Sequence, residues 1–196
     1  MIARSLVSDV ALPARAEFMP TGEAAADAAP QGFLSFCTRA ADQCEPSSAT
    51  ASILRLNAST WTTIERVNLR VNNSIKPQSD KKHYGVAEYW TIDTDGYGDC
   101  KDYALTKRKE LIDADLPERA LRIAVVVTLR NEQHAVLTVA TDRGDFVLDN
   151  LTNDILPWNQ TGYAWIARQD SGGRLGWVAY NGSARPVQPA ATSSAN

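Results

Sequence analysis

Cysteine, histidine and long apolar runs are scarce in this chain of 196 residues, which contains three cysteines and two histidines. The sequence has no stretch that is long and apolar enough to cross a bilayer, so we expect no membrane insertion. Its 20 basic and 23 acidic residues give a formal charge of −3, which leaves no excess of positive charge for binding nucleic acid. With 44% apolar residues, the chain is predicted to form one domain with a sizeable core.

Both ends of the chain are predicted to be flexible tails. Residues 1–31 are rich in alanine, proline and glycine without an amphipathic period, and residues 183–196 are polar. The domain is therefore expected over residues 32–182. A secretory signal needs an uninterrupted apolar core, and Asp9 interrupts the only such run near the start. We expect either that the signal is absent from this chain or that the protein stays in the cell.

Two of the three cysteines lie close together in the sequence. Cys37 and Cys44 are seven residues apart, which fits neither a C-x-x-C redox pair nor common zinc spacing. A local disulfide is the simpler interpretation, and disulfides persist in oxidising compartments such as the periplasm. The alternative is two buried free cysteines in a cytoplasmic protein. The disulfide interpretation leaves Cys100 as the single free thiol and favours a periplasmic location.

The residues that can carry chemistry follow one another as Cys100, His134 and Asp149. Asp99 is a good N-cap and Asp102 occupies the capping-box position, so Cys100 is predicted to begin a helix. A thiolate at that position is stabilised by the helix dipole and by free backbone N–H groups. A lone helical cysteine or strand histidine is usually structural, but the combination favours a nucleophile, its base and an orienting carboxylate.

His134 and Asp149 are predicted to lie on a hairpin whose turn is at residues 141–145. A turn centred on Asp142-Arg143 places Leu151 opposite His134, and one centred on Arg143-Gly144 places Asn153 there. Asp149 is an even number of positions from both, so it shares a face of the sheet with His134. Because the register is offset, the two side chains need a bulge or a diagonal contact.

Three segments together resemble a known family: G-D-C-x-D-Y-A at 98–104, H-A-V-L at 134–137 and L-D-N at 148–150. They are similar to the bacterial transglutaminase-like cysteine proteinases, which include the LapG-type periplasmic proteases that cleave large surface adhesins. The similarity extends from about Gly32 to Tyr180. The resemblance implies a papain-like, transglutaminase-like core in which the helix of the nucleophile lies against the sheet that carries His134 and Asp149.

We therefore predict a cysteine endopeptidase in which Cys100 attacks a peptide carbonyl, His134 transfers the proton and Asp149 orients His134. The resemblance implies a protein substrate at the cell surface or in the periplasm. Two alternatives stay open: acyl transfer to an amine, which uses the same chemistry, and a non-catalytic periplasmic binding module. Trp90 either lines the cleft or belongs to the core. The sequence does not indicate the oligomeric state.

Negative charge collects around the nucleophile and disfavours a thiolate unless a cation offsets it. The LapG-type relatives are calcium-dependent, which implies Asp99 and Asp102 as candidate Ca²⁺ ligands. Lys101, however, replaces the acidic residue that follows the cysteine in those relatives. We therefore expect weak or absent Ca²⁺ binding, no required cofactor, and tighter binding in the variant Lys101→Glu. Lys101 either neutralises Asp99 or Asp102 or points into solvent.

The remaining patterns predict an α+β fold with helices packed on an antiparallel sheet. Residues 52–75 carry an apolar stripe at helical spacing that is expected to pack on the sheet. Asn68 and Asn72 share one face of that helix and are positioned to brace a loop or to form an exposed edge. The basic run 107–109 is expected on the solvated face of the Cys100 helix, and the apolar run 121–129 predicts a buried central strand.

Overall fold

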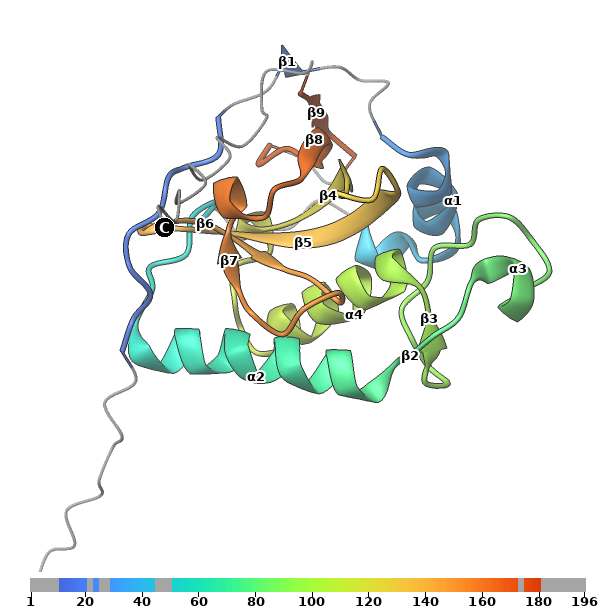
Figure 1. Cartoon of the computed structure of the whole chain (residues 1–196), viewed down its shortest axis with the longest axis horizontal. Helices are drawn as coiled ribbons and strands as arrows, with labels where there is room; N and C mark the ends of the chain where they lie inside the picture. The colour runs from blue at the N-terminus through green and yellow to red at the C-terminus, as the bar shows by residue number, and fades with distance from the viewer. Residues whose placement is uncertain (1–10, 21–22, 25–28, 45–50, 173–174, 181–196) are drawn as a thin grey trace, which may run out of the picture.

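The computed structural model describes residues 11–20, 23–24, 29–44, 51–172 and 175–180. Its main elements form three layers (Figure 1): an antiparallel sheet, helix α4 (Cys100–Asp113) packed on one face of that sheet, and helix α2 (Ala58–Ser74) packed on the far side of α4. The predicted α+β class is thereby confirmed. No helix in the described part of the chain has the length and apolar character needed to cross a bilayer.

Within the described residues the sheet has seven strands in the order β1-β9-β8-β4-β5-β6-β7, and all neighbours are antiparallel. The predicted central strand is confirmed as β4, which lies between β5 and β8. Its residues alternate between two apolar layers, one under α4 and one on the opposite face. The strands are β1 (Glu23–Ala24), β4 (Leu121–Val127), β5 (Gln133–Thr141), β6 (Gly144–Leu148), β7 (Leu156–Pro157), β8 (Ala164–Gln169) and β9 (Trp177–Ala179).

Helix α4 begins at Cys100, as its capping residues predict. The backbone N–H of Asp99 donates to Asp102 Oδ2 at 3.0 Å, which closes the capping box. The expectation of a solvated basic face is wrong for two of its three residues, because Lys107 is fully buried and Arg108 is 6% exposed, whereas the Lys109 side chain is 40% exposed. The helix lies between the sheet and α2, so both of its sides are covered. Arg108 compensates for burial by donating to Glu118 at 2.6 Å.

Helix α2 is shorter than its apolar stripe suggests. Asn57 caps it by accepting the backbone N–H of Thr60 at 2.9 Å, so residues 52–56 precede the helix, and Leu54 pairs with Thr141 at the sheet. The sequence predicts that the apolar stripe packs on the sheet. This prediction is wrong, because the stripe packs mainly on α4. The apolar period identifies the buried side of a helix but not the element that covers it.

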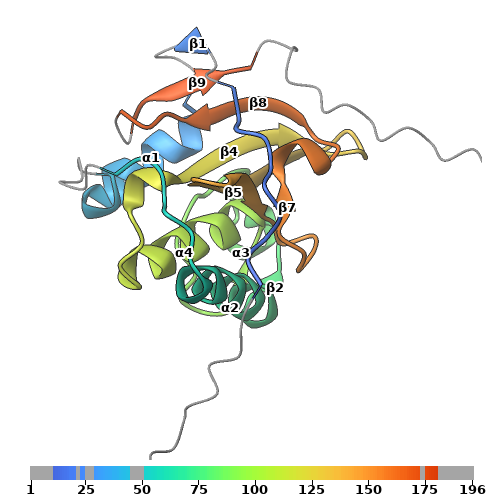
Figure 2. The ribbon, with the colours of Figure 1, turned by 90° about the vertical axis from the view of Figure 1, so that its left-hand side faces the viewer.

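Residues 11–20 differ from the tail that composition predicts over residues 1–31. Figure 2 shows this segment, in blue, running in front of the sheet. The backbone N–H of Ala16 donates to Arg143 O at 2.7 Å, and that of Met19 donates to Asp145 Oδ2 at 2.7 Å. Met19 is buried in the apolar layer opposite α4. An extended segment of this kind has no period for the sequence to display, and residues 1–10 and 181–196 lie outside the described residues.

Smaller elements connect the main helices and strands. A disulfide joins Cys37 and Cys44, as predicted. It connects the end of the first helix to the turn that follows it. The elements are α1 (Gln31–Arg39), α3 (Asp80–His83), the parallel pair β2 (Lys76–Pro77) and β3 (Tyr97–Gly98), and three single turns, η2 (Ala41–Gln43), η3 (Glu118–Ala120) and η4 (Trp158–Gln160).

Candidate active site

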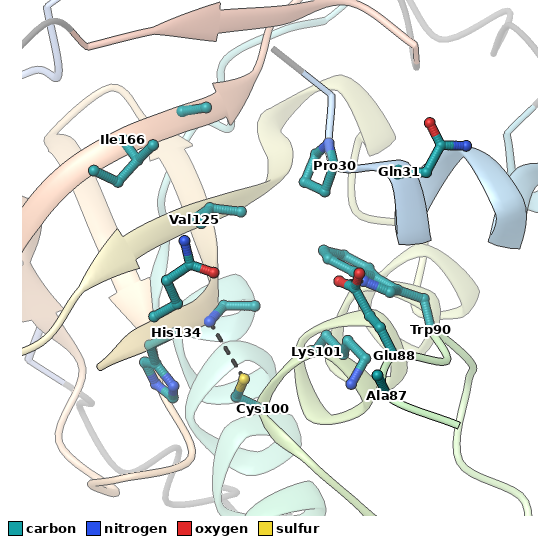
Figure 3. Close-up of a pocket in the computed structure, with 13 residues that line it drawn as sticks. Pro30, Gln31, Ala87, Glu88, Trp90, Cys100, Lys101, Val125, His134 and Ile166 are labelled. Atoms are coloured by element: carbon teal, nitrogen blue, oxygen red, sulfur yellow. Dashed lines mark hydrogen bonds between the residues drawn. The ribbon is translucent and has the colours of Figure 1, made fainter. Parts of the chain in front are cut away.

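The fold brings Cys100, His134 and Asp149 together at one end of the helix–sheet interface. Cys100 occupies the first turn of α4, and the backbone N–H of Ala135 on β5 donates to its Sγ at 3.4 Å. His134 is the second residue of β5, and its Nε2 lies 2.7 Å from Asp149 Oδ1. Figure 3 shows the Cys100 and His134 side chains close together beside a pocket.

The strand register explains how His134 meets Asp149. Thr141 pairs with Gly144 across a two-residue turn, and continuing that register places Leu151 opposite His134. Asp149 directly follows β6 and lies two positions from Leu151, so the contact is diagonal, on the shared face that the sequence predicts. The backbone N–H of Leu151 also donates to Asp149 Oδ1 at 3.0 Å.

The His134 side chain is held in its charged form. Burial lowers its pKa, but the hydrogen bonds to Asp149 and Cys100 outweigh that effect and raise the pKa to about 9. Burial raises the pKa of Asp149, whereas the hydrogen bond and charge of His134 lower it below its ordinary value. Since Nε2 is engaged by Asp149, Nδ1 is the ring nitrogen that remains for the thiol.

Tyr163 is a site residue that sequence reasoning missed. Its hydroxyl donates to Asp149 Oδ2 at 2.6 Å, and its ring meets the His134 ring edge-on with centroids 6.1 Å apart. Burial and the Asp149 carboxylate raise the pKa of Tyr163, so it stays a donor. It lies just before β8, outside the three motifs, and no local pattern marks it.

The loop after Asp149 is braced from α2. Asn72 Nδ2 donates to the carbonyl oxygens of Asp149 and Thr152 at 2.9 and 3.0 Å. Asn68 Nδ2 donates to the carbonyl oxygen of Asn153 at 3.0 Å. The prediction that this asparagine pair braces a loop is therefore confirmed, and the loop is the one that carries the carboxylate of the site.

A cleft of about 660 Å³ opens beside the thiol. Trp90 is 3% exposed and also forms part of the wall, so it is both a core and a cleft residue. Its Nε1 donates to Glu88 Oε1 at 2.7 Å. A Cβ at position 32 would lie 2.4 Å from the Trp90 ring, so only glycine allows α1 to approach this wall. The wall consists of Pro30, Gln31, Ala87, Glu88, Trp90, Cys100, Lys101, Val125, Gln133, His134, Ala135, Ile166 and Ala167.

An acidic cluster lies beside the cleft. One carboxylate oxygen from each of Asp80, Asp99 and Asp102 lies within 4.8 Å of the others, a grouping that could hold a metal ion. Asp99 and Asp102 are the predicted ligands, whereas Asp80, on α3, was not predicted. Lys101 does not point into solvent: its Nζ lies 2.6 Å from Asp80 Oδ2 and 2.5 Å from Asp99 Oδ2.

The carboxylates of this cluster favour the protonated form of the Lys101 side chain. Burial lowers the pKa of Lys101, but its hydrogen bonds to Asp80 and Asp99 raise the pKa above the ordinary value. Ca²⁺ needs its oxygen ligands at about 2.3–2.6 Å, and the nearest oxygens already surround Nζ at that distance. The donor set suits a hard cation, but with Lys101 present it does not fit Ca²⁺.

Comparisons with known proteins agree with this geometry. A family model described as bacterial transglutaminase-like cysteine proteinase, BTLCP, matches residues 23–185. No curated protein matches the chain. Among solved structures, LapG of Legionella pneumophila matches with a TM-score of 0.51 and 25% identity over 60% of this chain. That match spans 66% of the LapG chain, just under two thirds.

Two further LapG structures differ in their treatment. The EGTA-treated form matches with a TM-score of 0.53 and 25% identity, covering 64% of this chain and 70% of LapG. The calcium-bound form matches with a TM-score of 0.53 and 20% identity, covering 82% of this chain and 88% of LapG. These likenesses confirm the predicted transglutaminase-like fold.

Proposed function

Because the chain belongs to the bacterial transglutaminase-like cysteine proteinases, we propose that it is an endopeptidase with Cys100 as its nucleophile. Membership of this family agrees with the enzyme class predicted from the sequence, a cysteine peptidase. The observation that carries the proposed site is the 2.7 Å bond between His134 and Asp149 next to the Cys100 thiol. Cys100 and His134 line an open cleft, and Asp149 is buried behind His134.

The reaction begins when a peptide carbonyl enters the cleft next to Cys100. His134 Nδ1 already holds the proton taken from the thiol, in line with the raised pKa of the imidazole, and Sγ attacks the carbonyl carbon. His134 returns the proton to the leaving amine, which departs and leaves a thioester on Cys100. Water, deprotonated by His134, then hydrolyses the thioester. Asp149 keeps the ring oriented and stabilises its positive charge throughout.

The negative charge that develops on the carbonyl oxygen needs donors. The first backbone N–H groups of a helix have no acceptor within the helix, and those of Cys100 and Lys101 stand at the first turn of α4. We assign the oxyanion to these groups, aided by the helix dipole.

A protein substrate in the periplasm or at the cell surface fits the cleft and the disulfide. The cleft is open rather than enclosed, and its wall combines apolar side chains with polar ones that include a single carboxylate, Glu88. The bond between Cys37 and Cys44 suits an oxidising compartment, which supports a periplasmic location. The predicted interruption of a signal by Asp9 concerns residues outside the described part of the chain.

We further propose that the reaction needs no divalent metal ion. LapG has a calcium-bound form, but here Lys101 lies between Asp80 and Asp99. Peptide cleavage should therefore continue at the same rate in the presence of EGTA. A loss of activity that added Ca²⁺ restores would contradict this proposal.

The triad assignment is tested with Cys100→Ala, His134→Ala and Asp149→Ala. Each variant should reduce cleavage of a quenched fluorescent peptide library by about 10³-fold or more. Because the triad acts as a unit, the double variant Cys100→Ala with His134→Ala should be scarcely less active than Cys100→Ala alone. Thermal unfolding checks that each variant is folded.

Retention of more than about one hundredth of the activity in Cys100→Ala would rule out the nucleophile. Iodoacetamide labelling separates a peptidase from a binding module, because His134 should accelerate labelling of Cys100 only in an enzyme. An added primary amine that is incorporated into the product identifies acyl transfer instead of hydrolysis.

A further inference from the structure

The side chain of Lys101 is buried at the junction of α4 and α3. It begins on the first turn of α4, next to Cys100, and its ammonium lies 2.6 Å from Asp80 Oδ2 on α3. The same ammonium lies 2.6 and 2.5 Å from the two carboxylate oxygens of Asp99. The exposed fractions are 8% for the Lys101 side chain and 2% for that of Asp80, so water does little to screen this contact.

The third carboxylate is held by the backbone instead. Asp102 accepts the N–H of Asp99 at 3.0 Å and that of Thr91 at 3.1 Å. Within the part of the chain that the structure describes, Asp80 Oδ1 is buried and has no hydrogen-bond partner. The cluster therefore has more buried acceptor capacity than the lysine alone uses.

We propose that Lys101 is a tethered cation that takes the place of a divalent metal ion in this three-carboxylate cluster, and that removing its charge exposes a latent Ca²⁺ site. The inference rests on the proposed function for its link to the active cleft. Its binding chemistry depends only on the cluster.

The ion pair between Lys101 and Asp80 connects the helix of the nucleophile to the cleft wall that carries Glu88 and Trp90. Asp80 Oδ2 accepts the backbone N–H of Tyr89 as well as the Lys101 ammonium, and Tyr89 lies between the cleft residues Glu88 and Trp90. Figure 3 shows Lys101 on the same side of the pocket as these two residues. A lysine in this position orders the wall at any metal concentration, whereas a bound metal would order it only when the ion is present.

The test compares three variants by calorimetry with CaCl₂ and by thermal unfolding in CaCl₂ or EGTA. Lys101→Met removes the charge and keeps the length of the side chain, and Lys101→Glu adds a fourth carboxylate. Lys109→Glu is the matched control, because it makes the same charge change on the same helix at a side chain that is 40% exposed.

The wild type and Lys109→Glu should show no heat of Ca²⁺ binding. Each of the two proteins should have the same melting temperature in CaCl₂ as in EGTA. Lys101→Met in EGTA should melt roughly 5–15 °C below the wild type, because it leaves the buried carboxylate of Asp80 and the partly buried one of Asp99 without a cation. Added Ca²⁺ should restore much of that loss, and Lys101→Glu should bind Ca²⁺ at least about tenfold more tightly than Lys101→Met. Adding Asp80→Asn to Lys101→Glu should abolish the binding.

Tight binding of Ca²⁺ by the wild type that Asp99→Asn abolishes would overturn the proposal. So would the absence of Ca²⁺ binding in both Lys101 variants. If Lys101→Glu does not fold, Lys101→Met decides the question alone. None of these measurements uses peptide cleavage, so failure of the proposed peptidase activity would be seen separately, in the triad variants.

Discussion

At the scale of single residues, Tyr163 completes the set of donors around the Asp149 carboxylate. Its hydroxyl supplies the bond to Oδ2, while His134 and the Leu151 N–H share Oδ1. Tyr163→Phe should lower kcat about tenfold with KM changed less than about twofold, because the variant loosens the orientation of His134 without altering the cleft.

Tyr180→Phe is the control for this prediction, since it removes a similar bond, to Pro20 O at 3.0 Å, on the other face of the sheet. Steady-state kinetics on both variants provide the measurement. Equal kcat values for Tyr163→Phe and the wild type would show that the hydroxyl does not position the site.

The raised pKa of His134 makes stability depend on pH. The folded protein keeps the His134 proton up to a pKa of about 9, whereas the unfolded chain releases it near 6.5. The contribution is therefore complete below about pH 6.5 and is lost as the pH rises through 9. Urea unfolding at pH 6, 7.5 and 9 should show a difference between the wild type and His134→Gln that shrinks with pH. A constant difference would contradict the charged pair.

The site residues that the sequence predicts are those with a local signal. Cys100 is marked by the residues that cap its helix. His134 and Asp149 are marked by the hairpin, because Asp149 is an even number of positions from the residue opposite His134 and so shares its face of the sheet. Tyr163 and Asp80 have no such signal, because each reaches its partner only through the packing of distant segments. The sequence marks Lys101 as a departure from the family pattern, but its partner Asp80 lies on a separate helix that no periodicity marks.

At the scale of elements, α2 acts on the site through the loop that it braces. Asn72→Ala should lower the free energy of unfolding by about 1–3 kcal/mol, because three acceptors lose the Nδ2 donor. Peptide cleavage should fall about tenfold or more as Asp149 loses its position. Asn73→Ala, one residue along and exposed, should change neither quantity. Equal behaviour of the two variants would contradict the brace.

Helix α4 shows where sequence patterns mislead. A run of lysine and arginine normally marks a solvated helix face, but α4 is covered on both sides. Lys107 is fully buried, and burial lowers its pKa to about 7. The order of layers decides this outcome, and a single helix sequence does not encode that order.

At the scale of the whole molecule, the Cys37–Cys44 bond ties down the end of α1, the helix whose first turn borders the cleft. Replacing both cysteines with alanine should lower the free energy of unfolding by about 2–3 kcal/mol. Alkylation of protein from an oxidising compartment, denatured without reductant, should add one adduct per chain, at Cys100. Three adducts would contradict both the bond and the argument for periplasmic residence.

The nucleophile and its base come from different layers, since Cys100 belongs to α4, whereas His134 lies on β5 and Asp149 directly follows β6. A loosened chain can keep its helices and strands while its packed layers separate. Such a chain holds its thiol beyond the reach of its imidazole, so it should lose activity while its secondary structure persists. Precise packing of the layers, rather than the mere presence of the helices and strands, is therefore what assembles the nucleophile and its base.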